Sequence, residues 1–492
     1  MNKKIILICA LIMMLVMAHA QKKEKNHKSG YHIKFILEQV DDTMLFVANY
    51  YADKTYMYDS IFLSPKEPYT FILKGDTAIP RGVYVVAGQN KMKYFDFIID
   101  SSYNFTAHVT NISPQHLDFV NNITYTNSPE NTQANEFMRI AGHFQQEMAR
   151  INREMKNAES EQKQPSAKQI KAKKEEWMSY KDSLTRYTNQ YIEKYGTTTL
   201  FGKAQRFAQD VPIPDPPRDS KGRLLDSNFS YYYYVNHYWD FCDFTDSALI
   251  NTPIFHPRLE MYFSQVVYPL VDSIIKYADI LLDKMKDNEA LFRYTVWYIT
   301  NHYERSQYVG HDAVFVHMVL TYYAQGRCPW TDEAVLERMI DHAEQLNHVL
   351  IGKRAPELWM FDTNEVLLSN YGFNNKYTIM WFWDVDCGHC KTATPKLIEF
   401  YNTYKDTFDF EIYAVCMSSD TAKWKKAIIE KGLPWTNVGG NRANIDFRKI
   451  YGVTTTPYLY VLDREKKIIV KKIGVEDLES FFRNHEAGKR IQ

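Results

Sequence analysis

The feature that most constrains the fold is a buried strand that runs directly into two closely spaced cysteines. Residues 377–383 are apolar, β-branched or aromatic, which predicts a buried strand. The motif Cys387-Gly388-His389-Cys390 follows at once, and a helical pattern comes after it. The first cysteine is therefore expected at a helix N-terminus, where free backbone N–H groups and the helix dipole stabilise a thiolate.

This arrangement of two thiols is suited to dithiol–disulfide exchange. Cys387 is the expected exposed nucleophile, and Cys390, one helical turn further on, is the thiol that resolves the mixed disulfide. Gly388 and His389 are the expected redox-tuning residues. A protonated His389 beside the Cys387 thiolate stabilises the reduced form and makes the disulfide more oxidising.

Three other interpretations of the motif fit the sequence less well than redox exchange does. A structural zinc site needs two further ligands at suitable spacing, and none follows in the sequence. A purely structural disulfide across two residues closes too short a loop to add much stability. A peroxidase of the peroxiredoxin kind would have threonine three residues before its reactive cysteine, where this chain has Asp384. Redox exchange with no metal and no cofactor is the preferred interpretation.

Residues 351–486 resemble a thioredoxin-fold domain of the TlpA class, the secreted thiol–disulfide oxidoreductases. The matching pieces are the motif itself, Phe382-Trp383 before it, Pro395 after it, and residues 452–458 (GVTTTPY), which are similar to the family's cis-proline loop. The resemblance implies a cis bond between Thr456 and Pro457, in a loop that faces the nucleophile and pairs with a bound polypeptide like an added strand. Cys390 and Pro457 lie 67 positions apart, which leaves room for the extra β–α unit of this class.

The resemblance implies an exported enzyme that exchanges disulfides with protein thiols, acting as a reductase fed by a membrane electron donor. Because the C-G-H-C motif also occurs in disulfide isomerases, isomerase or oxidase activity stays open, as does a non-enzymatic envelope binding protein with a thioredoxin scaffold. The chain departs from the family at two positions. Trp381 replaces the buried aspartate of plain thioredoxins, and Ala393 replaces a glutamate found in some TlpA-class proteins. Asp384, Asp386 or water must then move the proton of the resolving thiol.

Length and composition bound the rest of the chain. With 492 residues, two or three domains are expected. Lysine plus arginine and aspartate plus glutamate both number 59, so no overall basic field recruits nucleic acid or acidic lipid. Residues 1–20 have the pattern of a secretory signal peptide cut after Ala20, which predicts a periplasmic or otherwise exported protein. No later stretch predicts a transmembrane segment.

The predicted organisation is multidomain. Residues 31–125 alternate with period two and predict an antiparallel β-sandwich, with strands at 31–40, 43–50, 68–73, 82–87, 94–99 and 103–109. Residues 126–350 predict an all-α middle domain, whose last helix covers 332–350 and is capped by Thr331. Residues 351–492 form the α/β thioredoxin-like domain. The first two regions are similar to modules of secreted Bacteroidetes-type thioredoxin-like proteins.

Three cysteines remain once the redox pair and the signal peptide are set aside. Cys416 lies in a predicted buried strand and is expected to be an inert core thiol. Cys242 and Cys328 lie in helical, aromatic-rich surroundings. Whether these two pair with each other stays open.

Overall fold

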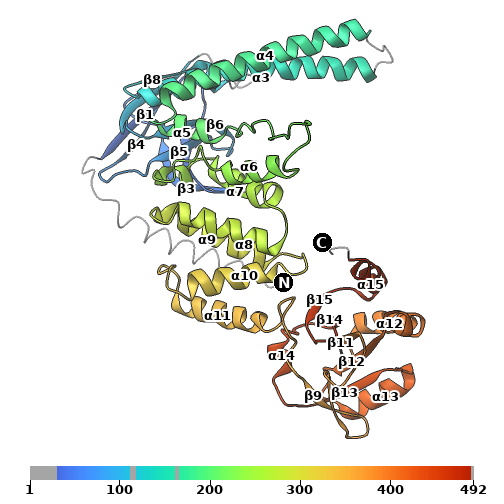
Figure 1. The fold of residues 1–492 in the computed structure, drawn as a ribbon. Coiled ribbons are helices and arrows are strands. Elements are labelled where there is room, and N and C mark those ends of the chain that lie inside the picture. Colours follow the sequence, from blue (N-terminus) through green and yellow to red (C-terminus); the bar gives the residue numbers. More distant parts are fainter. Residues whose placement is uncertain (1–29, 111–117, 161–165, 489–492) are drawn as a thin grey trace. The chain divides into compact units, whose positions relative to one another are not determined.

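The computed structural model describes residues 30–110, 118–160 and 166–488 (Figure 1). The predicted signal peptide, residues 1–20, lies outside the described residues. The chain divides into two compact units, of which the first comprises Met1–Tyr268 and Asp283–Tyr294 and the second Pro269–Leu282 and Thr295–Gln492. The predicted bounds of a separate middle domain at residues 126–350 therefore stay a proposal.

The first unit begins with two four-stranded sheets packed face to face. Their strand orders are β4-β1-β7-β8 and β3-β2-β5-β6. The strands are β1 (Tyr31–Leu37), β2 (Met44–Tyr51), β3 (Lys54–Phe62), β4 (Thr70–Gly75), β5 (Gly82–Ala87), β6 (Lys93–Ile99), β7 (Asn104–Val109) and β8 (Ile123–Thr126). Alternate residues such as Ile33, Phe35 and Leu37 are fully buried between the sheets, as period two requires. The β-rich module is therefore confirmed.

Two details of this module differ from the sequence prediction. The strand pairs are antiparallel except for β1 and β7, which run parallel, a pairing that local hairpin patterns do not reveal. Strands β3 and β8 were not predicted. In β3 the side chains alternate only between exposed and half-buried, and Ile61 alone is buried, so the strand lacks the apolar face by which a half-buried strand is recognised.

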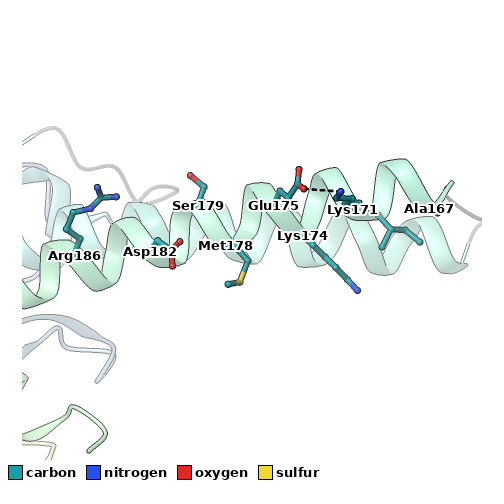
Figure 2. Close-up of a pocket in the computed structure, with 9 residues that line it drawn as sticks. Ala167, Lys171, Lys174, Glu175, Met178, Ser179, Asp182 and Arg186 are labelled. Carbon is teal, nitrogen blue, oxygen red and sulfur yellow. Dashed lines mark ion pairs between the residues drawn. The ribbon is translucent and has the colours of Figure 1, made fainter. Parts of the chain in front are cut away.

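The two longest helices of the first unit form an antiparallel hairpin. It consists of α3 (Pro129–Ser160) and α4 (Ala167–Tyr195), which lie side by side (Figure 1). Near the β module, Phe137 and Ala141 pack against Tyr191. Figure 2 shows the outer side of α4, where a shallow hollow is lined by residues of this one helix and Lys171 pairs with Glu175 at 3.9 Å. A hollow with one helix as its wall encloses no ligand site.

Shorter helices follow in the order of the chain. In the first unit these are α2 (Phe119–Asn122), α5 (Leu200–Phe207), α6 (Phe229–His237), η1 (Ser247–Asn251), α7 (Phe255–Met261) and η2 (Tyr262–Val266). The next are α8 (Val271–Lys284), α9 (Glu289–Glu304), α10 (Asp312–Met318), η3 (Val319–Tyr323) and α11 (Glu333–Asn347). The predicted cap Thr331 is wrong: Asp332 caps α11, because its carboxylate accepts the Val335 N–H at 3.2 Å.

The C-terminal part of the second unit is built on one seven-stranded mixed sheet in the order β10-β9-β13-β12-β11-β14-β15. The strands are β9 (Trp359–Asp362), β10 (Leu367–Ser369), β11 (Tyr377–Trp383), β12 (Phe410–Cys416), β13 (Thr436–Ala443), β14 (Tyr458–Leu462) and β15 (Ile468–Lys471). Every residue of the predicted strand β11 is buried. Strand β13 and α14 (Phe447–Ile450) supply the extra β–α unit that the spacing of Cys390 and Pro457 predicted.

Each face of this sheet carries its own apolar cluster. The first cluster contains residues of β11, β12, α12 (Gly388–Phe408), α13 (Thr421–Lys431) and α15 (Leu478–Glu486). The second contains residues of the segment 349–360, of α14 and of the opposite side of the same strands. The fold predicted for this region, a sheet between helices, is confirmed, and it places the end of β11 where α12 begins.

Candidate active site

The end of β11 and the start of α12 place the two cysteines of the motif. Cys387 is the N-cap of α12, with extended backbone at φ −70° and ψ 121°, and its sulfur accepts the Cys390 N–H at 3.4 Å. A cysteine thus occupies the position at which serine or aspartate usually binds the free N–H groups of a helix. This hydrogen bond stabilises the Cys387 thiolate more than the thiol, because the negative charge of the thiolate lies at the positive end of the helix dipole.

The loop before β14 lies directly against Cys387. The Cys387 Sγ donates to the carbonyl oxygen of Thr456 at 3.2 Å, and the Thr456–Pro457 peptide bond is cis, as predicted. Partial burial raises the pKa of the Cys387 thiol. Hydrogen bonds from the side chain of Thr456 and from the backbone N–H of Cys390 lower it by more, so the pKa lies below the ordinary value. Residues 69 positions apart are therefore joined at one reacting sulfur.

Cys390 has the opposite environment. It is 1 % exposed, whereas Cys387 is only half-buried. Burial raises the pKa of the Cys390 thiol to about 11, against a hydrogen bond from the backbone of Asp384 that lowers it. Thr394 lies one turn further along α12, where its hydroxyl donates to the Cys390 carbonyl at 2.6 Å. The two thiols thus combine one accessible, acidic sulfur with one shielded, weakly acidic sulfur.

The residues between the two cysteines are open to solvent. Gly388 and His389 are both exposed, and a methyl group placed on Gly388 would meet no atom within 4 Å. The position therefore does not require glycine for space. The contact of the His389 residue with the site is through its backbone, whose N–H also lowers the pKa of Cys387 against the effect of burial. The charge effect of the imidazole stays a proposal.

No carboxylate occupies either of the two positions at which relatives carry one. Trp381 is fully buried and stacks on Trp383 with the ring centres 5.5 Å apart, and Ala393 packs on the same cluster. Of the two aspartates near the motif, Asp386 is paired with Lys423 at 2.5 Å and Asp384 accepts the Asp386 N–H at 2.8 Å. The sequence did not signal the backbone contact of Asp384 with Cys390, because it depends on how the chain turns between β11 and α12.

Among the described residues, three further cysteines, Cys242, Cys328 and Cys416, are free thiols outside this pair. Burial raises the pKa of Cys416 to about 12, and Cys416 belongs to the same apolar cluster as Cys390. Burial also raises the pKa of Cys328 to about 12 and that of Cys242 well above its usual range. In the described part of the chain, no three His, Cys, Asp or Glu side chains are grouped to hold a metal ion.

Comparison with protein families identifies the class to which this site belongs. Residues 374–468 match the model of a family described as thioredoxin-like, and residues 222–348 match one described as a domain of unknown function (DUF5106). Through residues 374–468 the chain belongs to the thioredoxin-like family, which confirms the predicted thioredoxin fold and agrees with the TlpA-class resemblance. No curated protein matches the chain.

Several solved structures are similar to parts of the chain. A domain of a possible thiol-disulfide isomerase from Cytophaga hutchinsonii is 38% identical, covers 28% of this chain and 95% of its own, and has a TM-score of 0.27. The thioredoxin domain of a thiol-disulfide oxidoreductase from Bacteroides vulgatus is 28% identical, with coverage of 29% and 99% and a TM-score of 0.25. A thioredoxin-like protein from Bacteroides caccae is 17% identical, with coverage of 56% and 99% and a TM-score of 0.41.

Within residues 30–110, 118–160 and 166–488, no helix is both long and apolar enough to span a bilayer.

Proposed function

We propose that this protein is an exported thiol–disulfide oxidoreductase that acts on protein substrates, with Cys387 as nucleophile and Cys390 as resolving thiol. The observation that carries the proposal is the contrast between the two sulfurs at the start of α12. Cys387 is accessible and its pKa is lowered by hydrogen bonds, whereas burial raises the pKa of Cys390 to about 11. A catalytic pair needs this difference, because one thiol must be accessible to attack the substrate disulfide. The other must stay protonated and shielded until it resolves the mixed disulfide.

The proposed exchange has two steps. The Cys387 thiolate attacks one sulfur of a substrate disulfide, forms a mixed disulfide and releases the other substrate sulfur as a thiolate. The Cys390 thiol then loses its proton to water or to a nearby base and attacks the Cys387 sulfur, which releases the second substrate thiolate. The substrate gains two electrons, and the enzyme is left with a Cys387–Cys390 disulfide. A further dithiol, expected from a membrane electron donor, must return those two electrons for another turnover.

The loop of Thr456 and Pro457 supplies the surface that receives the substrate. Its carbonyl group at Thr456 lies 3.2 Å from the Cys387 sulfur, so a chain bound along this loop brings its own sulfur close to the nucleophile. The resemblance to the TlpA class implies that the backbone before Pro457 pairs with a bound polypeptide like an added strand. This contact favours protein substrates over small disulfides.

The opposite direction of exchange is the second candidate. The acidic Cys387 stabilises the reduced enzyme, and a stabilised reduced form makes the disulfide a better oxidant or isomerase. The reduction potential of the Cys387–Cys390 pair, measured by equilibration with glutathione buffers, distinguishes a reductase from an isomerase or oxidase. A reduction potential near that of thioredoxin, about −270 mV, supports a reductase, and a value near about −180 mV or above supports isomerase or oxidase activity.

Trapping of mixed disulfides tests the proposal itself. A Cys390→Ser variant, expressed in cells of the organism that makes the protein, is expected to accumulate covalent complexes through Cys387 that dissociate on reduction. The Cys387→Ser/Cys390→Ser double variant is the matched control and should trap nothing. If Cys390→Ser captures no more protein than the control, the chain is not an oxidoreductase, and the role of a binding protein with a thioredoxin scaffold is favoured instead.

A further inference from the structure

A buried lysine joins the last strand of the sheet to helices that lie outside the thioredoxin-like match at residues 374–468. The side chain of Lys471, in β15, is only 2 % exposed. Its ammonium group donates to the carboxylate of Asp312 in α10 and to the Val349 carbonyl at 2.7 Å. Because a buried charge is costly unless it is paired, this cation depends on both partners, the α10 carboxylate and the carbonyl that follows α11.

The position of Lys471 connects this ion pair to the loop at the candidate active site. In the ladder between β14 and β15, Lys471 lies opposite Tyr460, and the Lys472 N–H donates to the Leu459 carbonyl at 3.0 Å. Strand β14 begins at Tyr458, the residue directly after the cis bond. Burial, with a smaller contribution from the charge of Asp312, raises the pKa of Tyr458 to about 12, so the carboxylate lies close enough to the start of this strand to act on it.

A second contact reaches the same loop from its other end. Gly452, with φ +61°, begins the segment that leads to Thr456, and a Cβ placed there would lie 4.0 Å from the Leu346 side chain of α11. Nearby, Lys449 pairs with Asp341 of α11 at 2.8 Å, but both of these side chains are about half exposed. An exposed pair of this kind contributes little, whereas the Asp312–Lys471 pair is almost dry.

We propose that Asp312 and Lys471 are positioning residues that hold the Thr456–Pro457 loop against Cys387 by fixing β15 and, through it, the start of β14. The helices α10 and α11 are then part of the redox machinery. This inference rests on the proposed function, since it assigns a role towards the same nucleophile. It follows that the redox site is completed by a helical residue, Asp312, that lies 75 positions before Cys387.

The reactivity of Cys387 gives a readout that a merely structural role would not change. The side chain of Thr456 supplies one of the hydrogen bonds that lower the pKa of Cys387 against the effect of burial, so a loop that moves away leaves the thiolate less stable. Two variants of the full chain remove the same connection. Asp312→Asn removes the counter-charge, and Lys471→Met removes the buried cation while Asp312, 16 % exposed, keeps contact with water. Asp341→Asn, at the exposed pair, is the matched control.

The experiment measures the rate of Cys387 alkylation by iodoacetamide from pH 5 to 10 in the reduced protein, with the modified residue identified by mass spectrometry. Either variant is expected to move the midpoint upwards by at least about 0.5 pH unit and to slow the reduction of insulin disulfides, while Asp341→Asn changes neither. If a folded Asp312→Asn or Lys471→Met protein keeps the wild-type midpoint, the positioning role is wrong. If the wild type itself lacks an acidic Cys387, the proposed function fails instead.

Discussion

The two faces of the seven-stranded sheet hold their large aromatic side chains in different ways. On the face covered by α12, four tryptophans are buried, and none of their indole N–H groups has a hydrogen-bond partner among the described residues; they are Trp381, Trp383, Trp424 and Trp435. On the other face, the buried tyrosines donate their hydroxyls: Tyr413 to the Leu358 and Leu368 carbonyls, Tyr451 to Pro356 and Tyr460 to Tyr451. One face depends on packing, and the other also on hydrogen bonds.

The difference follows from what each face has to hold. Tyr413 and Tyr451 fasten the irregular segment 355–358, because they and Asn370 donate to the Leu358 and Pro356 carbonyls. The tryptophans lie beneath regular helices, whose backbone groups are already paired, so volume is the main requirement. A dry apolar face also suits the site, because burial there keeps Cys390 and Cys416 protonated near neutral pH.

The largest effect is expected from Trp381→Ala on the packed face. The side chain is fully buried between Trp383 and Trp435, so its removal leaves a large cavity. Chemical denaturation followed by circular dichroism should show a loss of about 3–5 kcal/mol in the free energy of unfolding. A loss below about 1 kcal/mol would mean that this face does not depend on close packing.

The second prediction concerns the thiols at this face. Hydrogen bonds lower the pKa of Cys387 below its ordinary value, whereas burial raises that of Cys390 to about 11. At pH 8 the thiolate fraction of Cys387 should therefore exceed that of Cys390 by at least about tenfold. Alkylation of the native reduced protein should modify Cys387 first and leave Cys416 intact until unfolding. Equal labelling of Cys387 and Cys390 would contradict the assignment of their roles.

The third prediction tests the hydrogen-bonded face. Tyr413→Phe keeps the ring but leaves the Leu358 and Leu368 carbonyls without this donor. The free energy of unfolding should fall by about 1–2 kcal/mol. Tyr232→Phe, at a side chain that is 48% exposed, is the control and should be neutral. If both substitutions are neutral, the two faces differ in their residue types, but the tyrosine hydrogen bonds do not contribute to stability.

The smallest effect is expected at His389, where backbone and side chain can be separated. Burial raises the pKa of Cys387, and the His389 N–H is among the groups that lower it. His389→Pro removes both this N–H and the imidazole, so the midpoint of Cys387 alkylation should rise by about half a pH unit, whereas His389→Ala keeps the N–H. An equal rise in both variants would assign the effect to the imidazole charge. No change in either would mean that Thr456 and the Cys390 N–H set the acidity.

The sequence predicted those parts of the domain that are determined by residues close together in the chain. The buried run of β11, the two cysteines and the Thr456–Pro457 bond each carry a local signal, and the structure has each where it was predicted. Strands β9 and β10 escaped prediction because they have only four and three residues. The Asp312–Lys471 pair joins residues 159 positions apart, and neither residue type signals such a partner.

The unpaired tryptophans under α12 also give the molecule an optical property. Four of its nine tryptophans lie in one dry cluster that includes Cys390 and approaches Cys387. Indole emission shifts to shorter wavelength where no water or hydrogen-bond acceptor relaxes the excited state, and a disulfide quenches it by accepting an electron. The tryptophan fluorescence of the unlabelled protein should therefore be lower when Cys387 and Cys390 form a disulfide than when they are reduced, and should report each change of oxidation state during turnover.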